Sequence, residues 1–282
     1  MKVVDDIASL RKLTTEWKFS GSTVGFVPTM GNLHNGHLKL VKRAKAHNSR
    51  VVVSIFVNPM QFGANEDLDA YPRTIEEDKA KLIEAGVDAV FLPSVSDMYP
   101  GGVEHQTVVE VPDISDILCG ASRPGHFRGV ATVVSKLFNM VHPHDAFFGE
   151  KDFQQLQVIR TMVRDLSMGV TIHGIPTERD VSGLALSSRN GYLTDEQRHT
   201  AATIYSEMTS LKARIEAGER NYVALAADLA DILTDSGFKN DYVHIVNAQS
   251  LKPAKETDAH LVILVAAFLG NTRLIDNLQI HV

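Results

Sequence analysis

A chain of 282 residues can hold one large domain or two ordinary ones. With 44% hydrophobic and 22% charged residues it has the composition of a soluble globular protein, and its formal net charge of −6 argues against a general nucleic-acid-binding protein. The single cysteine, Cys119, excludes an internal disulfide and favours a reducing, cytoplasmic location. We expect no membrane span and no signal peptide, since no sufficiently long apolar run is present.

The first two thirds of the chain alternate short apolar runs with amphipathic stretches. The predicted strands are 23–27, 50–57, 88–92, 145–149 and 170–175. The predicted helices are 5–18, 34–45, 74–86, 130–141 and 154–166. This alternation predicts an α/β fold with a Rossmann-like, doubly wound parallel sheet. We expect Pro28 to end the first of these strands and residues 93–129 to be irregular.

The last third of the chain predicts a smaller α+β domain. Thr194–Gln197 is a capping box that starts a long helix reaching about residue 217, and a second helix is predicted at 221–236. The predicted strands are 241–247, 261–268 and 273–280, of which the last two form a hairpin. We expect domains at 1–180 and 181–282.

Two segments are candidates for closing over a ligand. One is the C-terminal domain, expected to act as a lid hinged near residues 176–190. The other is the glycine-containing stretch 120–129, which carries Arg123, His126 and Arg128. An ordinary solvated surface loop explains the composition of 120–129 equally well.

A glycine turn follows the first of the long strands. Gly31 and Gly36 allow the backbone to come close to a ligand, and His34 and His37 share one face at the start of the next helix. Because the first turn of a helix has unpaired N–H groups that favour an anion, this unit suits the phosphates of a nucleotide. A surface histidine pair or half of a metal site is the alternative.

Two further strand ends carry polar residues. Asn58 and Gln61 follow the strand at 50–57, and neutral amides there can hold a small polar substrate, although loop capping by Asn58 is the simpler interpretation. After the strand at 145–149, Lys151 is suited to reach a phosphate, and Asp152 to cap a helix or hold Mg²⁺.

A hydroxyl-rich motif lies near the predicted domain boundary. Ser187 and Ser188 precede Arg189, a set that suits a phosphate chain. A simple linker is the alternative interpretation of this segment.

Four motifs in this order carry a resemblance. They are PTMGNLHNGH (28–37), NPMQF (58–62) with YPR (71–73), FGEKDFQQ (148–155) and LSSRN (186–190). Together they resemble the pantothenate synthetase (pantoate–β-alanine ligase) family, a member of the nucleotidyltransferase superfamily with a His-x-Gly-His signature. The resemblance runs from about residue 20 to 195 and departs at Ser182, where many members carry an acidic residue.

The resemblance implies a two-step, ATP-dependent reaction. Pantoate and ATP form pantoyl adenylate and pyrophosphate, and the amine of β-alanine then attacks the acyl carbon to give pantothenate and AMP. The implied partners are these small molecules and a second copy of the chain in a homodimer, with no nucleic acid and no membrane. Mg²⁺ is the implied cofactor, with Asp152 as its ligand.

The resemblance also implies roles for individual residues. His34, His37 and Lys151 are the implied catalytic groups, Gln61 and Gln155 hold pantoate, and Gln61 and Asn58 contact β-alanine. The implied ATP-binding residues are Met30, Gly31, His34, His37, Gly149, Glu150, Lys151, Asp152, Glu178, Leu186, Ser187, Ser188 and Arg189.

Two other functions fit the same motifs. One is a different nucleotidyltransferase, which would transfer an adenylyl group to another acceptor and would have no need of the glutamine set. The other is a non-catalytic nucleotide-binding regulator. Pyrophosphate release from ATP that depends on pantoate separates the ligase from both.

Overall fold

The computed structural model describes residues 1–63 and 66–282 and divides the chain into two compact units. The first comprises Met1–Glu150 and Gln155–Pro176, and the second comprises Lys151–Gln154 and Thr177–Val282. Within the described residues, every helix is too short or too polar to cross a membrane.

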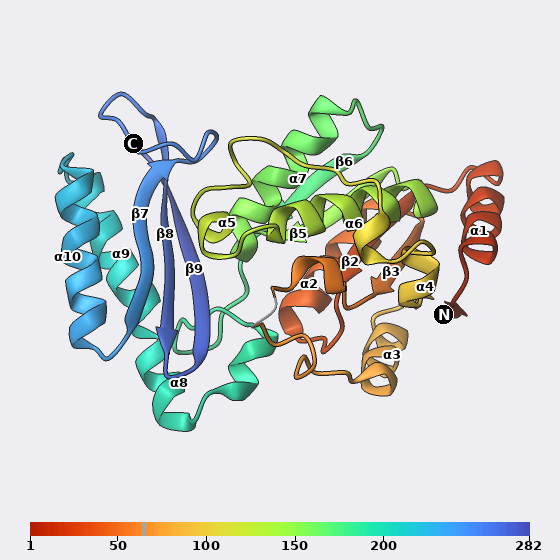
Figure 1. Cartoon of the computed structure of the whole chain (residues 1–282), viewed down its shortest axis with the longest axis horizontal. Helices are drawn as coiled ribbons and strands as arrows, with labels where there is room; N and C mark the ends of the chain where they lie inside the picture. The colour runs from red at the N-terminus through yellow and green to blue at the C-terminus, as the bar shows by residue number, and fades with distance from the viewer. Residues whose placement is uncertain (64–65) are drawn as a thin grey trace. The chain divides into compact units, whose positions relative to one another are not determined.

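The first unit is built on a six-stranded parallel sheet of order β1-β4-β3-β2-β5-β6 (Figure 1). Its strands are β1 (Lys2–Val4), β2 (Val24–Thr29), β3 (Arg50–Ile55), β4 (Ala89–Phe91), β5 (Asp145–Gly149) and β6 (Thr171–Ile175). From β2 the chain moves outward through β3 to β4, and then returns to the other side of β2 for β5. The strand order therefore reverses between β2 and β5, where open α/β sheets bind ligands.

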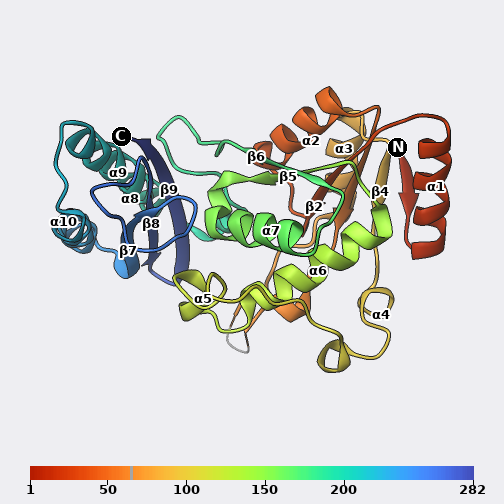
Figure 2. The same cartoon turned by 90° about the horizontal axis from the view of Figure 1, so that it is seen from above.

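Helices cover both faces of this sheet, as the predicted α/β fold requires. They are α1 (Ile7–Phe19), α2 (Asn35–His47), α3 (Ile75–Glu84), α4 (Val95–Met98), α5 (Cys119–Ser122), α6 (His126–Val141) and α7 (Phe153–Asp165). Figure 2 shows α2 and α3 on one face of the sheet and α6 and α7 on the other. Short 3₁₀ turns are η1 (Pro59–Gln61), η2 (Val103–His105), η3 (Glu150–Asp152) and η4 (Ser188–Tyr192).

One expectation about the strands is wrong, and one strand was not predicted. Pro28 lies within β2, opposite Ser54 of β3. On its other side β2 pairs with β5 only at Gly25 and Phe26, so Pro28 lies beyond that pairing. The missing N–H of proline therefore costs no hydrogen bond to β5. The three-residue strand β1, paired with β4, is too short to show a sequence pattern.

The expectation of an irregular segment over 93–129 holds only in part. Residues 99–118 are irregular apart from η2, but α4, α5 and the first turn of α6 also lie within the segment. Two glycines of this segment, Gly129 and Gly120, are required by packing. A Cβ on Gly129, inside α6, would lie 2.4 Å from the carbonyl oxygen of Met60 and 2.8 Å from the Cα of Gln61. A Cβ on Gly120 would lie 1.8 Å from the carbonyl oxygen of Ser115. Glycine thus lets α6 rest directly on the backbone of η1.

The second unit has a three-stranded antiparallel sheet, β7 (Lys239–Asn247), β8 (His260–Leu269) and β9 (Thr272–His281), in that order. Its helices are α8 (Asp195–Ala201), α9 (Thr203–Glu216) and α10 (Tyr222–Asp235), and Figure 1 shows α9 and α10 on one face of the sheet. Leucine and isoleucine side chains of α9, α10 and β8 form its core. The predicted hairpin is confirmed, but the predicted long helix is broken at Ala202.

We expect Gly129→Ala to lower the free energy of unfolding by about 1–3 kcal/mol, because the new methyl group overpacks the contact between α6 and Met60. Thermal or urea unfolding measures this loss. Gly169→Ala is the matched control, since no atom lies within 4 Å of the added methyl group. Equal stability of the two variants would contradict the packing role of Gly129.

Candidate active site

The turn between β2 and α2 carries the first predicted site residues. Gly31 has a φ of +87°, in the left-handed region that favours glycine. His34 is the N-cap of α2, and its Nδ1 accepts a hydrogen bond from the N–H of Gly36 at 3.1 Å. The Nδ1 of His37 accepts from the N–H of His34 at 3.3 Å. The two imidazoles therefore form a capping box, a role that Ser or Thr and Glu or Gln usually fill.

These bonds determine where each neutral imidazole carries its proton. A backbone N–H can only donate, so the Nδ1 atoms of His34 and His37 act as acceptors. The proton of each neutral ring then lies on Nε2, which becomes a donor. The ring centroids are only 4.1 Å apart, so both donors belong to one end of one helix. Such a pair suits an anionic ligand.

Asp78 of α3 anchors the same turn. Its buried carboxylate accepts hydrogen bonds from the N–H groups of Asn32 at 2.9 Å and Leu33 at 2.7 Å. Thr74 donates its hydroxyl to this carboxylate at 3.2 Å, and Lys81 donates to the carbonyl of Leu33 at 2.7 Å. Helix α3 thus fixes the backbone that leads into the histidine pair.

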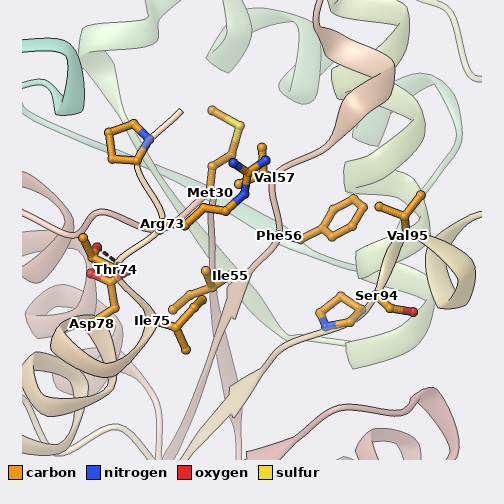
Figure 3. A pocket seen from close by; sticks show the side chains of 13 residues that line it. Met30, Ile55, Phe56, Val57, Arg73, Thr74, Ile75, Asp78, Ser94 and Val95 are labelled. Atoms are coloured by element: carbon orange, nitrogen blue, oxygen red, sulfur yellow. Dashed lines mark hydrogen bonds between the residues drawn. The ribbon is translucent and has the colours of Figure 1, made fainter. Parts of the chain in front are cut away.

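A cavity of about 270 Å³ opens beside the turn (Figure 3). Met30, Ile55 and other residues that end β2 and β3 line one part of it, and Arg73 and Thr74, just before α3, line another. Residues after β4 contribute Ser94. The cavity therefore lies at the carboxyl ends of three neighbouring parallel strands, where this class of sheet binds small molecules.

Gln61 lies next to Met30, and Asn58 is bonded to Gln61. The Nε2 of Gln61 is 3.2 Å from the Met30 sulfur, and Nδ2 of Asn58 donates to Oε1 of Gln61 at 3.1 Å. Asn58 caps η1 and is only 1% exposed. The structure thus brings the three residues together, with Asn58 buried behind Gln61; a direct contact of Asn58 with β-alanine stays a prediction.

The segment expected to be a loop at 120–129 holds the backbone of Gln61 in place. His126 Nδ1 lies 2.8 Å from the carbonyl oxygen of Gln61, and an Arg123 nitrogen lies 3.4 Å from the same atom. Arg123 also forms a two-bond ion pair with Glu66. Burial raises the pKa of Glu66, but hydrogen bonding to Arg123 and the charges of Arg123 and His126 outweigh it, so this pKa is lowered.

In the second unit, Lys151 and Asp152 lie in η3. The side-chain amide of Asn277 in β9 donates to the carbonyl oxygen of Lys151 at 2.9 Å. Asn277 is itself buried, and its backbone N–H donates to the carboxylate of Asp276 at 2.7 Å. Strand β9 therefore fixes the backbone from which the Lys151 side chain extends.

Of the remaining predicted nucleotide residues, Gly149 and Glu150 lie in the first unit. The others, Glu178, Leu186, Ser187, Ser188 and Arg189, lie in the second. The N–H of Leu186 donates to the carbonyl of Glu178 at 2.9 Å. Ser187 is the N-cap of η4, with its hydroxyl accepting from the N–H of Arg189 at 3.2 Å. The motif is therefore a capped 3₁₀ turn that includes Ser188.

Arg179 supports this segment and carried no signal in the sequence. Its guanidinium pairs with both carboxylate oxygens of Asp276, donates to the carbonyl of Gly183 at 3.0 Å and lies 3.7 Å from the centroid of the Tyr205 ring. Gly183 has a φ of +93°, and a Cβ there would lie 2.7 Å from the Tyr205 ring. These contacts tie the turn before Leu186 to the antiparallel sheet.

Sequence reasoning also missed Asp78 and Tyr99. Asp78 had a detectable signal, because it lies between Ile75 and Leu82 on the apolar face of the predicted helix, where a carboxylate needs buried partners. Tyr99 had none, since its hydroxyl donates to Asn58 at 2.6 Å across 41 residues of sequence.

The fold and these residues define a doubly wound α/β enzyme of the nucleotidyltransferase type, with a histidine-capped glycine turn at the strand reversal. The profile of the family described as Pantoate-beta-alanine ligase matches residues 2–279, and the chain belongs to this family. It therefore catalyses the ATP-dependent ligation of pantoate and β-alanine, as the resemblance implied.

Individual relatives agree over the full chain. The pantothenate synthetase of Alteromonas mediterranea is 69% identical, with 99% of each chain covered, and that of Shewanella denitrificans is 57% identical, with 97% of each covered. The crystal structure of the Thermus thermophilus pantothenate synthetase is 45% identical, with a TM-score of 0.94 and 100% of both chains covered. The Francisella tularensis pantoate-beta-alanine ligase, crystallised with β,γ ATP and β-alanine, is 35% identical, with a TM-score of 0.83 and coverage of 99% and 97%.

The two histidine nitrogens can be separated by substitution. Asn in place of His37 keeps an acceptor near the Nδ1 position but no donor at the reach of Nε2, whereas Gln supplies a donor near Nε2. We expect His37→Asn to slow adenylate formation about 10²–10³-fold and His37→Gln to slow it less. Single-turnover pyrophosphate release measures this, with ATP affinity measured separately. If pyrophosphate release were slower in His37→Gln than in His37→Asn, the assignment of Nε2 as the donor would be contradicted.

Proposed function

We propose that the histidine-capped turn after β2 binds the phosphates of ATP while pantoyl adenylate forms. The observation that carries this proposal is the pair of hydrogen bonds into His34 and His37 Nδ1, which places the proton of each neutral ring on Nε2, a donor that suits a phosphate oxygen. Met30 and Gly31 then line the nucleotide through backbone atoms. Gly149, the last residue of the neighbouring strand β5, and Glu150, which follows it, complete this set in the first unit.

In the second unit, Lys151, Ser187, Ser188 and Arg189 are the groups that we assign to the phosphates. They are all donors, and two are cations at neutral pH, which suits the charge that develops on the departing pyrophosphate. The anchoring of the Lys151 backbone by Asn277, and the capping of η4 by Ser187, support a defined position for each. Glu178 and Leu186, joined by their backbone bond, are assigned to the rest of the nucleotide.

For pantoate we propose Gln61 and Gln155. Gln61 lines the side of the turn next to Met30, and Gln155 lies in the first turn of α7, after β5. A neutral amide can bond to the hydroxyl and carboxylate oxygens of pantoate without adding charge. The related Francisella enzyme was crystallised with β-alanine, and we assign β-alanine here to a site that includes Gln61.

The chemistry proceeds in two displacements. A carboxylate oxygen of pantoate attacks the α-phosphorus of ATP, forming an acyl–phosphate bond as the bond to pyrophosphate breaks. The deprotonated amine of β-alanine then attacks the acyl carbon, and the acyl–oxygen bond breaks to release AMP. The residues above bind and orient these groups and stabilise the developing negative charge, and no covalent enzyme intermediate is needed.

Asp152 is the residue that we assign to Mg²⁺. Among the described residues no three His, Cys, Asp or Glu side chains gather in a metal-binding cluster. Mg²⁺ in nucleotide enzymes is usually held by one or two carboxylates with substrate phosphates as the other ligands, so a single Asp152 fits that pattern. When bound, the ion would neutralise charge on the phosphates.

The homodimer implied by the family stays a prediction.

Lys151→Ala is expected to slow the first half-reaction far more than the second. The reason is that its ammonium is assigned to phosphate charge, which matters while pyrophosphate leaves. Supplying preformed pantoyl adenylate with β-alanine should largely restore pantothenate formation. If the second half-reaction were lost to the same extent, Lys151 would have another role.

Gln155→Ala is expected to raise the KM for pantoate about 10-fold or more while leaving the KM for ATP nearly unchanged. A site that bonds a substrate oxygen loses affinity when that partner is removed. Steady-state kinetics with each substrate varied in turn measures the two values. Gln157→Ala, two residues along the same helix, is the control, and a rise confined to ATP would contradict the assignment.

A further inference from the structure

A chain of buried polar side chains runs behind Gln61, and its first member, Tyr99, has no place in the function described so far. The Tyr99 hydroxyl donates to Oδ1 of Asn58 at 2.6 Å, and Nδ2 of Asn58 donates to Oε1 of Gln61 at 3.1 Å. Tyr99 is 2% exposed, Asn58 1% and Gln61 9%. Only Gln61, the last member, reaches Met30 beside the turn.

Two backbone groups fix the direction of the Asn58 amide. The N–H of Met60 can only donate, and it lies 3.2 Å from Asn58 Oδ1; the carbonyl of Gly129 can only accept, and it lies 3.2 Å from Asn58 Nδ2. Oδ1 and Nδ2 therefore cannot exchange places without losing both bonds. As a result Asn58 presents an N–H, and not an oxygen, to Gln61.

The direction of Gln61 follows from that of Asn58. Because Asn58 donates, the atom of Gln61 that faces it must be the acceptor Oε1, and the Nε2 group turns toward Met30. The thioether of Met30 is a weak acceptor, so a stronger acceptor on a substrate can readily replace it as the partner of the Gln61 N–H. Gln61 accordingly presents N–H donors on the side of the turn, which suits a carboxylate or hydroxyl oxygen.

Tyr99 completes the arrangement from a distant segment. Burial raises the pKa of its phenol above the usual range, so the hydroxyl stays protonated and able to donate. Meanwhile the backbone of Gln61 is held independently by His126 and Arg123. Loss of the Tyr99 hydroxyl therefore acts on the side-chain amides, while the backbone of η1 keeps its own supports.

We propose that Tyr99 is a positioning residue for pantoate, acting through Asn58 to hold the Gln61 amide with its N–H donors toward the substrate. This inference rests on the proposed role of Gln61 in pantoate binding. It adds to that role a direction: Gln61 acts as a donor, and the partner on pantoate acts as an acceptor.

The test is a double-mutant cycle on the full-length enzyme, with the KM for pantoate as the main readout. We expect Tyr99→Phe to raise this KM about two- to tenfold, the range expected for one hydrogen bond, with the KM for ATP and the melting temperature little changed. In a Gln61→Ala background, Tyr99→Phe should add no further rise, because the amide that it orients is gone. Tyr222→Phe is the matched control, since the buried Tyr222 hydroxyl has no hydrogen-bond partner within the described residues.

The outcomes distinguish a failure of the substrate role of Gln61 from a failure of the positioning role of Tyr99. If Gln61→Ala leaves the pantoate KM unchanged, the substrate role of Gln61 fails and the inference falls with it. If Gln61→Ala raises the KM but Tyr99→Phe does not, or acts equally in both backgrounds, only the inference is overturned.

Gln61→Glu tests the donor direction without touching Tyr99. The carboxylate keeps an acceptor for Asn58 but has no N–H to offer, so we expect the pantoate KM to rise at least as much as in Gln61→Ala. A wild-type KM in Gln61→Glu would overturn the inference even if Tyr99→Phe proved too unstable to assay.

Discussion

The parallel pairing of β2 with β3 on one side and β5 on the other is the constraint on which the rest of the first unit depends. Parallel strands all end at the same edge, so the glycine turn after β2, η1 after β3 and Gly149 at the end of β5 are brought to one edge of the sheet. Residues more than 100 positions apart in the chain become neighbours by this pairing alone, as His144 does when its Nδ1 accepts from the N–H of Val24. The long helices on the two faces bury the strands and leave this edge to the loops.

Backbone N–H groups can only donate and backbone carbonyl groups can only accept, so they fix the orientation of nearby histidine and carboxamide side chains. Imidazole rings and carboxamides can each present either a donor or an acceptor, and rotation exchanges the two. At the start of α2 the backbone N–H groups require Nδ1 of both histidines to accept, and behind η1 Met60 and Gly129 require the Asn58 amide to face one way. The groups that we assign to the substrates are thus oriented before any ligand arrives, which lowers the cost of binding.

In the second unit, side-chain hydrogen bonds hold the backbone of the segments that we assign to the phosphates. Arg179 and Asp276 brace the segment before η4, and Asn277, the next residue, bonds to the carbonyl of Lys151. Adjacent residues of β9 therefore support both the capped serine turn and the lysine that we assign to phosphate. A ligase that forms a reactive acyl phosphate needs such groups held in position, because water competes with the amine for the intermediate.

The sequence by itself determined the fold class and the order of nearly all long elements, because buried parallel strands and amphipathic helices are local patterns. Its four spaced motifs indicated the reaction through their resemblance to the ligase family. It also located the histidine turn correctly, since strand, glycine and helix are consecutive. The tertiary structure alone decided the rest. Gly129 falls outside the predicted helix, and only the packing of α6 on Met60 explains why a glycine is there. The burial of Asn58 between Tyr99 and Gln61 likewise follows from the packing and not from the sequence. Tyr99, Arg179 and Asn277 gave no local signal, because each acts through a hydrogen bond to a residue far away in the chain, and such partners are chosen only when the sheets and helices pack.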